Sequence, residues 1–442
     1  MSDDTKFGPP KGMRDWLPRD VRLRQKLIRL IERHYQLYGF QPLDTPVLEN
    51  IEVLQGKGGG ENEKLMFRVL KRGDDLARSW ESKNVADLGL RFDLTVPLAR
   101  YAANHWNDLP KPFRCYHIGP VWRADRPQRG RFREFYQCDI DIVGGAAGAH
   151  EVELLLATDR VLRELNVGKF KIRVSDKRLL PALLGGLGVE VEKIAGVAVA
   201  LDKLDKQPFE SVWQEIERLG HAPETLTRLQ TFLRETIAGE RDLTRLNLPE
   251  VTTLHGQITA LCERVREVNS SASVAADPLL VRGFDYYTGP VFEIAVEDAN
   301  FAFSIGGGGR YDGLIEKLGG PKNTPAVGIS LGFERILTIL QEKDQAASAG
   351  TFPRVYLANF GQSEKDLLAL AETLRSRGIP VEAGLEKRDF PKQMMAAQAA
   401  GIELAVTGFG PAAGTLKVRR LSTRQDQAMT IDELATVFAG TP

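Results

Sequence analysis

Cysteine is scarce in this 442-residue chain, which has three cysteines and no CxxC pair. Its scarcity excludes a disulfide framework and a structural zinc site and fits a reducing compartment. An excess of either charge is also missing, because Lys+Arg and Asp+Glu both number 59. A polyanionic partner would therefore have to be held by local basic patches, not by the field of the whole protein.

Long apolar runs are missing as well. No stretch approaches the roughly 18 uncharged apolar residues of a membrane-spanning helix, and the polar, Pro/Gly-rich first 20 residues lack the apolar segment of a signal peptide. We therefore expect a cytoplasmic protein without contact with a membrane. The apolar fraction of 43% over this length leaves room for two or three domains with a large core.

The most informative stretch that is present is 113–144. Apolar and aromatic runs at 113–122 and 132–143 predict two antiparallel strands, joined by a long charged loop. Four arginines lie between positions 126 and 133; so dense a cluster is stable in solvent, as a basic turn, or against an anion such as phosphate. Arg123 is expected within the first strand between apolar neighbours, where an arginine needs a partner.

Upstream of this hairpin, helical spacing at 21–38 is followed by a predicted strand at 40–48 whose prolines restrict it to a sheet edge. This unit is either a dimer-forming element or an ordinary domain edge. The glycine run at 56–60 does not match a phosphate-binding loop and predicts a flexible loop near a site. At 88–101, alternation places Arg91, Asp93 and Thr95 on one face of an extended segment, as part of a site or as a core-edge salt bridge.

Downstream, residues 176–275 predict a helical insertion over a sheet-rich core, with basic residues that are either solvated or turned to a polyanion. A strand and turn are expected at 278–296. A strand ending in four glycines is expected at 301–314, where the bare backbone could lie against a flat ligand. The pattern at 326–340 predicts a strand entering a helix, with Arg335 in the helix's first turns, where its charge suits a phosphate.

The polar linker at 341–352 is the clearest boundary in the chain. It separates a predicted catalytic domain at 1–340, which contains the insertion, from alternating strands and helices at 353–442. The fold class is therefore predicted as α+β: an antiparallel sheet with flanking helices and a helical insertion, followed by a small α/β domain.

Fixed arginines without a P-loop or a dinucleotide fingerprint indicate a nucleotide bound on an antiparallel sheet. At this point the chain resembles the class II aminoacyl-tRNA synthetases: TPVLE around Pro46 is similar to motif 1, the dimer motif, the hairpin at 113–144 to motif 2, and GISLGFERIL to motif 3. The peptides LVRGFDYYTGPVFE and SIGGGGRYDGL resemble the two that are peculiar to the histidyl-tRNA synthetase family. LRFDLTVPLARY and EFYQCDIDIVG look more like that family's eukaryotic-type branch.

The resemblance implies that L-histidine is activated with ATP and then transferred to the terminal ribose of tRNA-His. Its ATP-binding residues would be Arg123 on the α-phosphate, Arg335 on the γ-phosphate, Asp125 near the adenine, and Arg131. With Arg282, which reaches the α-phosphate from the other side, Arg123 and Arg335 would be the catalytic residues, because fixed guanidinium groups stabilise the charge that develops on the phosphoryl oxygens. Mg²⁺ would bridge the leaving phosphates, and its ligands are left unassigned.

The resemblance also implies a histidine pocket, in which a buried acceptor left unpaired by an apolar competitor makes an editing domain unnecessary. Asp141 and Tyr287 would face the imidazole, and the other members would be Asp93, Thr95, Gln137, Arg282, Tyr286 and Tyr311. For tRNA, Gln128 and Arg129, with Arg131, would meet the acceptor end. The C-terminal domain is similar to the family's anticodon reader: Lys392 and Gln393 fit, whereas 408–414 lacks the usual acidic residue. A homodimer is implied by motif 1.

Two other functions compete with this one. A catalytically idle paralogue, such as the regulatory subunit of ATP phosphoribosyltransferase, would bind histidine as a signal, but such proteins usually lack the anticodon domain and lose motif arginines that this chain has. A sheet-based nucleic-acid-binding module without enzymatic activity would leave Tyr287 and the glycine-rich strand unexplained.

Overall fold

The computed structural model describes residues 7–55, 65–204, 207–281, 286–298, 300–301, 303–343, 353–386 and 388–439. These divide into two compact units: one contains the described residues up to 343 apart from 17–23, and the other contains 17–23 and the described residues from 353 onward. The glycine run at 56–60, Arg282 and most of the expected linker lie outside the described residues.

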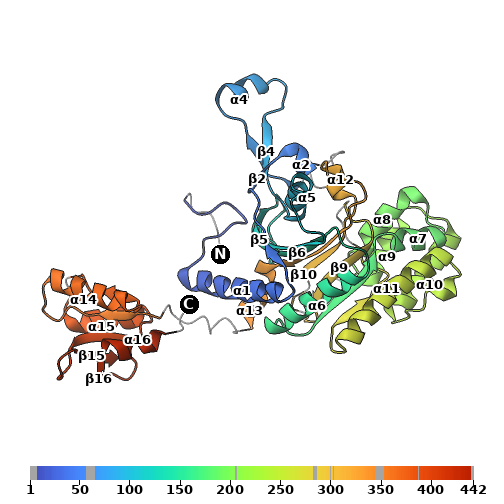
Figure 1. Ribbon diagram of the computed structural model, residues 1–442. Helices are drawn as coiled ribbons and strands as arrows, with labels where there is room; N and C mark the ends of the chain where they lie inside the picture. Colours follow the sequence, from blue (N-terminus) through green and yellow to red (C-terminus); the bar gives the residue numbers. More distant parts are fainter. Residues whose placement is uncertain are drawn as a thin grey trace. The chain divides into compact units, whose positions relative to one another are not determined.

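An eight-stranded sheet organises the first unit (Figure 1). Its neighbours pair antiparallel except at the two edges, which confirms the predicted antiparallel sheet and the predicted hairpin. The strand order is β1 (Gln41–Pro42), β5 (Phe113–Trp122), β6 (Glu134–Val143), β11 (Ala326–Gly332), β10 (Ser304–Arg310), β9 (Pro290–Val296), β7 (Phe170–Asp176) and β8 (Val274–Ala276).

Helices cover one face of this sheet (Figure 1): α1 (Pro18–Leu37), α6 (Ala149–Glu164) and α13 (Phe333–Glu342). The predictions for α1, β11 and α13 are confirmed, because their apolar spacing is regular over several turns or several strand residues. Arg335 is the third residue of α13, as expected.

The strand expected at 40–48 is wrong. The chain forms only the two-residue β1, parallel to β5 at the sheet edge, and then β2 (Leu48–Asn50), which belongs to a separate three-stranded sheet with β4 (Ala86–Leu90) and β3 (Arg68–Leu70). Pro42 and Pro46 lack the N–H groups that a continuous ladder needs. Helices α2 (Ile51–Gln55), α4 (Gly73–Ser79), α5 (Thr95–Asn104) and α12 (Leu314–Lys317) complete this part.

The extended segment expected at 88–101 is also wrong, because β4 ends at Leu90 and α5 begins at Thr95. Arg91 does not share a face with Asp93 and Thr95: its Nη1 donates to the Thr45 carbonyl over 2.7 Å and its Nε to the Pro120 carbonyl over 2.9 Å. Arg91 therefore holds the sheet edge together and does not line the cavity.

The helical character expected for the insertion is present: α7 (Leu179–Gly186), α8 (Val191–Leu201), α9 (Phe209–Glu217), α10 (Pro223–Ile237), a 3₁₀ turn (Thr244–Leu246) and α11 (Pro249–Val268). The strand expected from 278 begins only at Pro290, and Tyr286 and Tyr287 precede it in irregular backbone. The expected glycine-rich strand is present as β10, whose last five residues are the four glycines and Arg310.

The second unit is a five-stranded mixed sheet in the order β13 (Val381–Ala383), β12 (Val355–Leu357), β14 (Leu404–Phe409), β15 (Thr415–Arg420) and β16 (Gln425–Thr430). Its helices are α14 (Glu364–Ser376), α15 (Phe390–Ala399) and α16 (Ile431–Phe438), and both parallel and antiparallel pairs occur. This confirms the small α/β fold. β16 was not predicted, because its polar residues lack an apolar alternation.

Candidate functional site

A cavity lies on the sheet face opposite α6. It brings together eleven residues predicted from the sequence: Asp93, Thr95, Arg123, Asp125, Arg131, Gln137, Asp141, Tyr286, Tyr287, Tyr311 and Arg335. They come from six separate segments of the chain, and the sheet is what makes them neighbours.

The alternation of side chains along β6 directs three polar residues into the cavity. Successive residues of a strand point to opposite faces, so Gln137, Asp139 and Asp141 of β6 share the cavity face. The adjacent strand β11 contributes Gly328, where a Cβ would lie only 1.8 Å from the Asp141 carboxylate. Any side chain at position 328 would therefore displace Asp141.

Arg123 lies immediately after β5 and not inside it, which corrects the expectation. Its N–H donates to the Arg133 carbonyl over 2.8 Å, so the hairpin continues to hold it. The Nε donates to the Phe92 carbonyl over 2.9 Å, and the guanidinium lies 5.1 Å from the Phe135 ring centroid. Removal from water lowers the pKa of Arg123, whereas Asp93 opposes that shift; the side chain stays a cation at neutral pH.

Two carboxylates are each held by a tyrosine hydroxyl. Tyr286 donates to Asp93 Oδ2 over 3.2 Å, and Tyr311 donates to Asp141 Oδ1 over 2.7 Å. Burial raises the pKa of Asp93 to about 6 in spite of hydrogen bonding and Arg123. Burial likewise raises the pKa of Asp141 to about 7, with Tyr311 opposing the shift. A cationic or N–H-bearing ligand would favour the charged form of each acid and would therefore lower both pKa values again.

Arg335 approaches the cavity from the N-terminal turn of α13. Its Nε donates to the Gly130 carbonyl over 2.8 Å and its Nη1 to the Ser304 carbonyl. Gly130 adopts φ +71°, and a Cβ there would meet the Phe303 ring at 3.1 Å. The left-handed backbone and the close contact both favour glycine at position 130, and this glycine lets the hairpin loop lie against α13.

Several lining residues were missed from the sequence. Asp139 is buried, and burial together with Asp141 raises its pKa well above the ordinary range. Glu334 accepts from Arg24 over 2.7 Å and from the Tyr136 N–H over 2.6 Å. The period-two pattern that placed Gln137 and Asp141 on one face also marks Asp139. Glu334 carried no such signal, because its partner Arg24 lies 310 residues away.

Gln128 and Arg129 do not line the cavity and lie at the tip of the hairpin loop, where Gln128 and Arg131 form an isolated bridge. Arg129 is exposed, and its Nη2 contacts Glu342 Oε2 at 2.5 Å. In the second unit, Gln393 is buried and bonded to the backbone of Asn359 and Arg388, whereas Lys392 is exposed. Gln393 therefore organises its own fold.

The described part of the chain contains no group of three or more His, Cys, Asp or Glu side chains placed to hold a metal ion. It also contains no helix that is both long and apolar enough to cross a membrane.

An antiparallel sheet whose cavity combines motif arginines with a glycine-rich strand defines the catalytic domain of a class II aminoacyl-tRNA synthetase. A model of the family described as "Histidyl-tRNA synthetase" matches residues 12–336, and one described as "Anticodon binding domain" matches residues 354–441. The chain therefore belongs to the histidyl-tRNA synthetase family.

Individual relatives agree with this assignment. The chain is 36% identical to the histidine–tRNA ligase of Porphyromonas gingivalis, over 97% of this chain and 98% of that protein. The solved histidyl-tRNA synthetase from Nostoc sp. PCC 7120 has a TM-score of 0.78 at 28% identity, covering 98% of this chain and 99% of that one. A Bacillus halodurans structure titled as an ATP phosphoribosyltransferase regulatory subunit/histidyl-tRNA synthetase, with a TM-score of 0.69 at 22% identity, covers 91% of this chain and 98% of its own and shows the fold alone.

Proposed function

We propose that this chain activates L-histidine with ATP, forming histidyl-adenylate and pyrophosphate, and then transfers histidine to the 3′-terminal ribose of tRNA-His. The observation that carries the proposal is the content of one cavity. Arg123 and Arg335 lie in it together with two carboxylates, Asp93 and Asp141, that are each bonded to a tyrosine. A protein that bound ATP without an amino acid substrate would not need the two tyrosine-bonded carboxylates.

In the first step the histidine carboxylate attacks the α-phosphorus, and the bond to the leaving pyrophosphate breaks. Negative charge grows on the phosphoryl oxygens, and guanidinium groups fixed beforehand stabilise it without reorganising. Arg123 would contact the α-phosphate and Arg335 the γ-phosphate, while Asp125 and Arg131 would hold the nucleotide. Arg282, which lies outside the described residues, completes the proposed set.

In the amino acid pocket, Asp141 and Tyr287 would face the imidazole. Asp93, Thr95 and Gln137 would hold the α-amino and carboxylate groups, with Tyr286 and Tyr311 enclosing them. The Tyr311 hydroxyl occupies one lone pair of Asp141, which leaves the others for an imidazole N–H. An apolar competitor would leave that buried carboxylate unpaired, and this loss is the physical basis of discrimination.

Magnesium would neutralise charge on the departing pyrophosphate. It commonly binds through substrate phosphates and one or two carboxylates, without an all-protein cage. Asp125 and Glu334 are the carboxylates of the cavity wall nearest in sequence to the proposed phosphate arginines. Glu334 is already engaged by Arg24 and the Tyr136 N–H, and Asp125 lies 3.6 Å from Arg131 and is assigned to the adenine, so the protein ligands of the ion stay unassigned.

For tRNA, Gln128 and Arg129 at the loop tip would meet the acceptor end, and the C-terminal unit would read the anticodon. The motif 1 segment supports a homodimer, and two exposed apolar side chains within it, Val47 and Leu48, suit an interface. Three free cysteines and a tRNA substrate support a cytoplasmic location.

Histidine-dependent exchange of radiolabelled pyrophosphate into ATP tests the first step. Exchange that requires histidine, together with charging of tRNA-His, is the expected result. A regulatory paralogue would bind histidine in calorimetry without catalysing exchange, and that outcome would overturn the proposal.

A further inference from the structure

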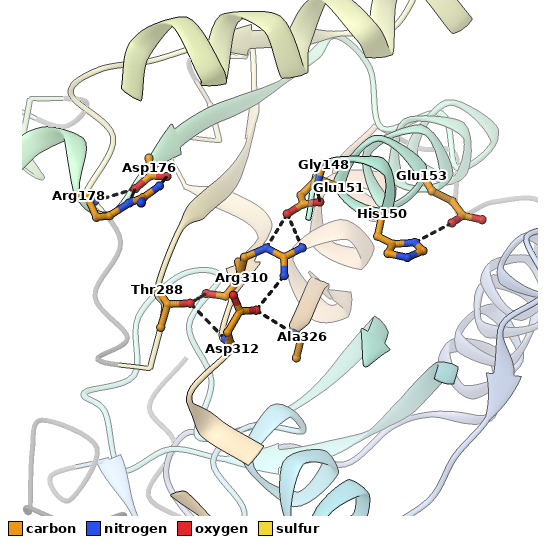
Figure 2. Close-up of polar contacts among 10 residues, drawn as sticks. All are labelled: Gly148, His150, Glu151, Glu153, Asp176, Arg178, Thr288, Arg310, Asp312 and Ala326. Atoms are coloured by element: carbon orange, nitrogen blue, oxygen red, sulfur yellow. Dashed lines mark hydrogen bonds and ion pairs between the residues drawn. The ribbon is translucent and has the colours of Figure 1, made fainter. Parts of the chain in front are cut away.

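Behind the cavity lies a buried ion pair that has no part in the roles given above. Arg310, the last residue of β10, is 4% exposed, and Glu151, in the first turn of α6, is 1% exposed. Arg310 Nε donates to Glu151 Oε1 over 2.7 Å, and Nη2 lies 2.6 Å from the same oxygen (Figure 2). Desolvation offsets much of the attraction in such a pair, so stability alone is a weak reason for it.

The pair is tied to the backbone on both sides of Tyr311. Arg310 Nη1 donates to Asp312 Oδ1 over 2.8 Å, and the same oxygen accepts from the Ala326 N–H over 2.8 Å (Figure 2). The Asp312 N–H donates to Thr288 Oγ1 over 3.2 Å, and the Thr288 N–H donates to the Arg310 carbonyl over 2.7 Å. Both neighbours of Tyr311 are therefore fixed, and so is the residue that follows Tyr287.

Two side-chain contacts, one on each face of the sheet, connect the end of β10 to the segment formed by β6 and α6 across the intervening strand β11. On the cavity face, the Tyr311 hydroxyl reaches Asp141 beside Gly328, where β11 carries no side chain. On the helix face, Arg310 reaches Glu151. Asp141 and Glu151 belong to one segment, β6 followed directly by α6, and Arg310 and Tyr311 are consecutive.

We propose that the Arg310–Glu151 ion pair is a positioning device that holds the Tyr311 hydroxyl against Asp141 and thereby sets the affinity for histidine. The inference rests on the proposed function. Arg310 and Glu151 touch no substrate and act through Tyr311. Because displacements of about 1 Å in a binding constellation can change rates by about 10²-fold, the pair is expected to change KM for histidine and leave KM for ATP unchanged.

The test measures both KM values by pyrophosphate exchange in Glu151→Gln. KM for histidine is expected to rise about tenfold or more, with KM for ATP within about twofold of wild type. The matched control is Arg178→Gln, which breaks the nearby pair between the half-exposed Arg178 and the buried Asp176 (Figure 2) and should leave both values unchanged. If Glu151→Gln does not fold, Arg310→Lys keeps the charge and loses the forked geometry, and the same KM pattern is expected of it.

A double-mutant cycle with Tyr311→Phe separates positioning from general destabilisation. Once the hydroxyl is gone, Glu151→Gln should add little to KM for histidine, because both changes remove the same contact. Additive effects would overturn the proposal, as would a lower melting temperature without a change in KM for histidine. A wild-type protein without exchange would instead contradict the proposed function, and histidine affinity by calorimetry on the same variants would still decide the role of the ion pair.

Discussion

The two units of the chain hold their charges in different ways. In the cavity-bearing unit, Arg24 and Glu334 pair at 2.7 Å with side chains 8% and 4% exposed, and Arg310 and Glu151 are buried to a similar degree. On the sheet of the C-terminal unit, Asp426 accepts from Arg419 over 2.6 and 2.9 Å and pairs with Lys417 at 3.0 Å, with all three side chains partly in water.

This difference predicts where substitutions matter. Breaking a buried pair leaves an uncompensated charge and destabilises a protein by about 3–5 kcal/mol, whereas an exposed pair contributes about 0–1 kcal/mol. Charged side chains in the cavity on the eight-stranded sheet can also bind a substrate strongly, because little water competes for them there. We therefore expect large functional effects at the cavity and small effects on the surface of the C-terminal unit.

The largest effect is expected for Arg123→Ala. Removing one fixed donor to a developing charge typically costs about 10²–10³-fold in rate, so kcat/KM for pyrophosphate exchange should fall by that factor. Arg126→Ala, an exposed change on the same loop, is the control and should retain wild-type exchange. Equal losses in the two variants would mean that the loop acts through its net charge alone.

A smaller effect is expected for Asp141→Asn. A hydrogen bond to a charged acceptor contributes about 1.5–3 kcal/mol, so KM for histidine should rise about 10–10²-fold while KM for ATP changes little. The control is Asp139→Asn on the same strand face. Burial and Asp141 both disfavour a charge on Asp139 and raise its pKa well above the ordinary value, so an uncharged amide is a mild change at this position and should alter KM only a few-fold. If Asp139→Asn raised KM for histidine and Asp141→Asn did not, Asp139 would be the acid that faces the imidazole.

These raised pKa values also predict a pH dependence of stability. Asp141 has an ordinary pKa of 3.8 and a pKa of about 7 in the fold, so between these values the folded state binds more protons than the unfolded state. Its stabilising contribution is full below the lower value and is lost as pH rises through the upper one. Urea denaturation of the ligand-free protein should show stability falling from pH 4 to 7, and Asp141→Asn should flatten the curve.

How far the sequence alone leads depends on the length of the pattern. The strands at 113–122 and 134–143 could be predicted because ten alternating residues leave little ambiguity. The break between Leu90 and Thr95 could not be predicted. The alternation that placed Arg91 on the same face as Asp93 ends where β4 stops and α5 begins. Arg310 and Glu151 are 159 residues apart, and no local period connects them.

An intermediate effect is expected at the hairpin tip, which belongs to the first unit but is exposed. Arg129→Ala should leave exchange unchanged and raise KM for tRNA by roughly 2–10-fold, with the salt dependence of tRNA affinity reduced by about one phosphate contact. Glu342→Gln, which frees Arg129 from its partner, should not weaken charging. Loss of exchange in Arg129→Ala would show that the tip serves ATP and not tRNA.

The smallest effect is expected for Asp426→Ala on the C-terminal sheet. Hydrogen bonds from Arg419 and Lys417 hold the pKa of Asp426 well below its ordinary value, so its contribution is present at neutral pH and is lost only in strong acid. Solvent screens the pair, and the loss in unfolding free energy should stay under about 1 kcal/mol, as measured by hydrogen exchange of the β15 and β16 amides. Glu151→Gln, measured in the same way on β10, should exceed it several-fold. A loss at Asp426 as large as at Glu151 would contradict the contrast between the units, because exposure would then not set the energy of an ion pair in this chain.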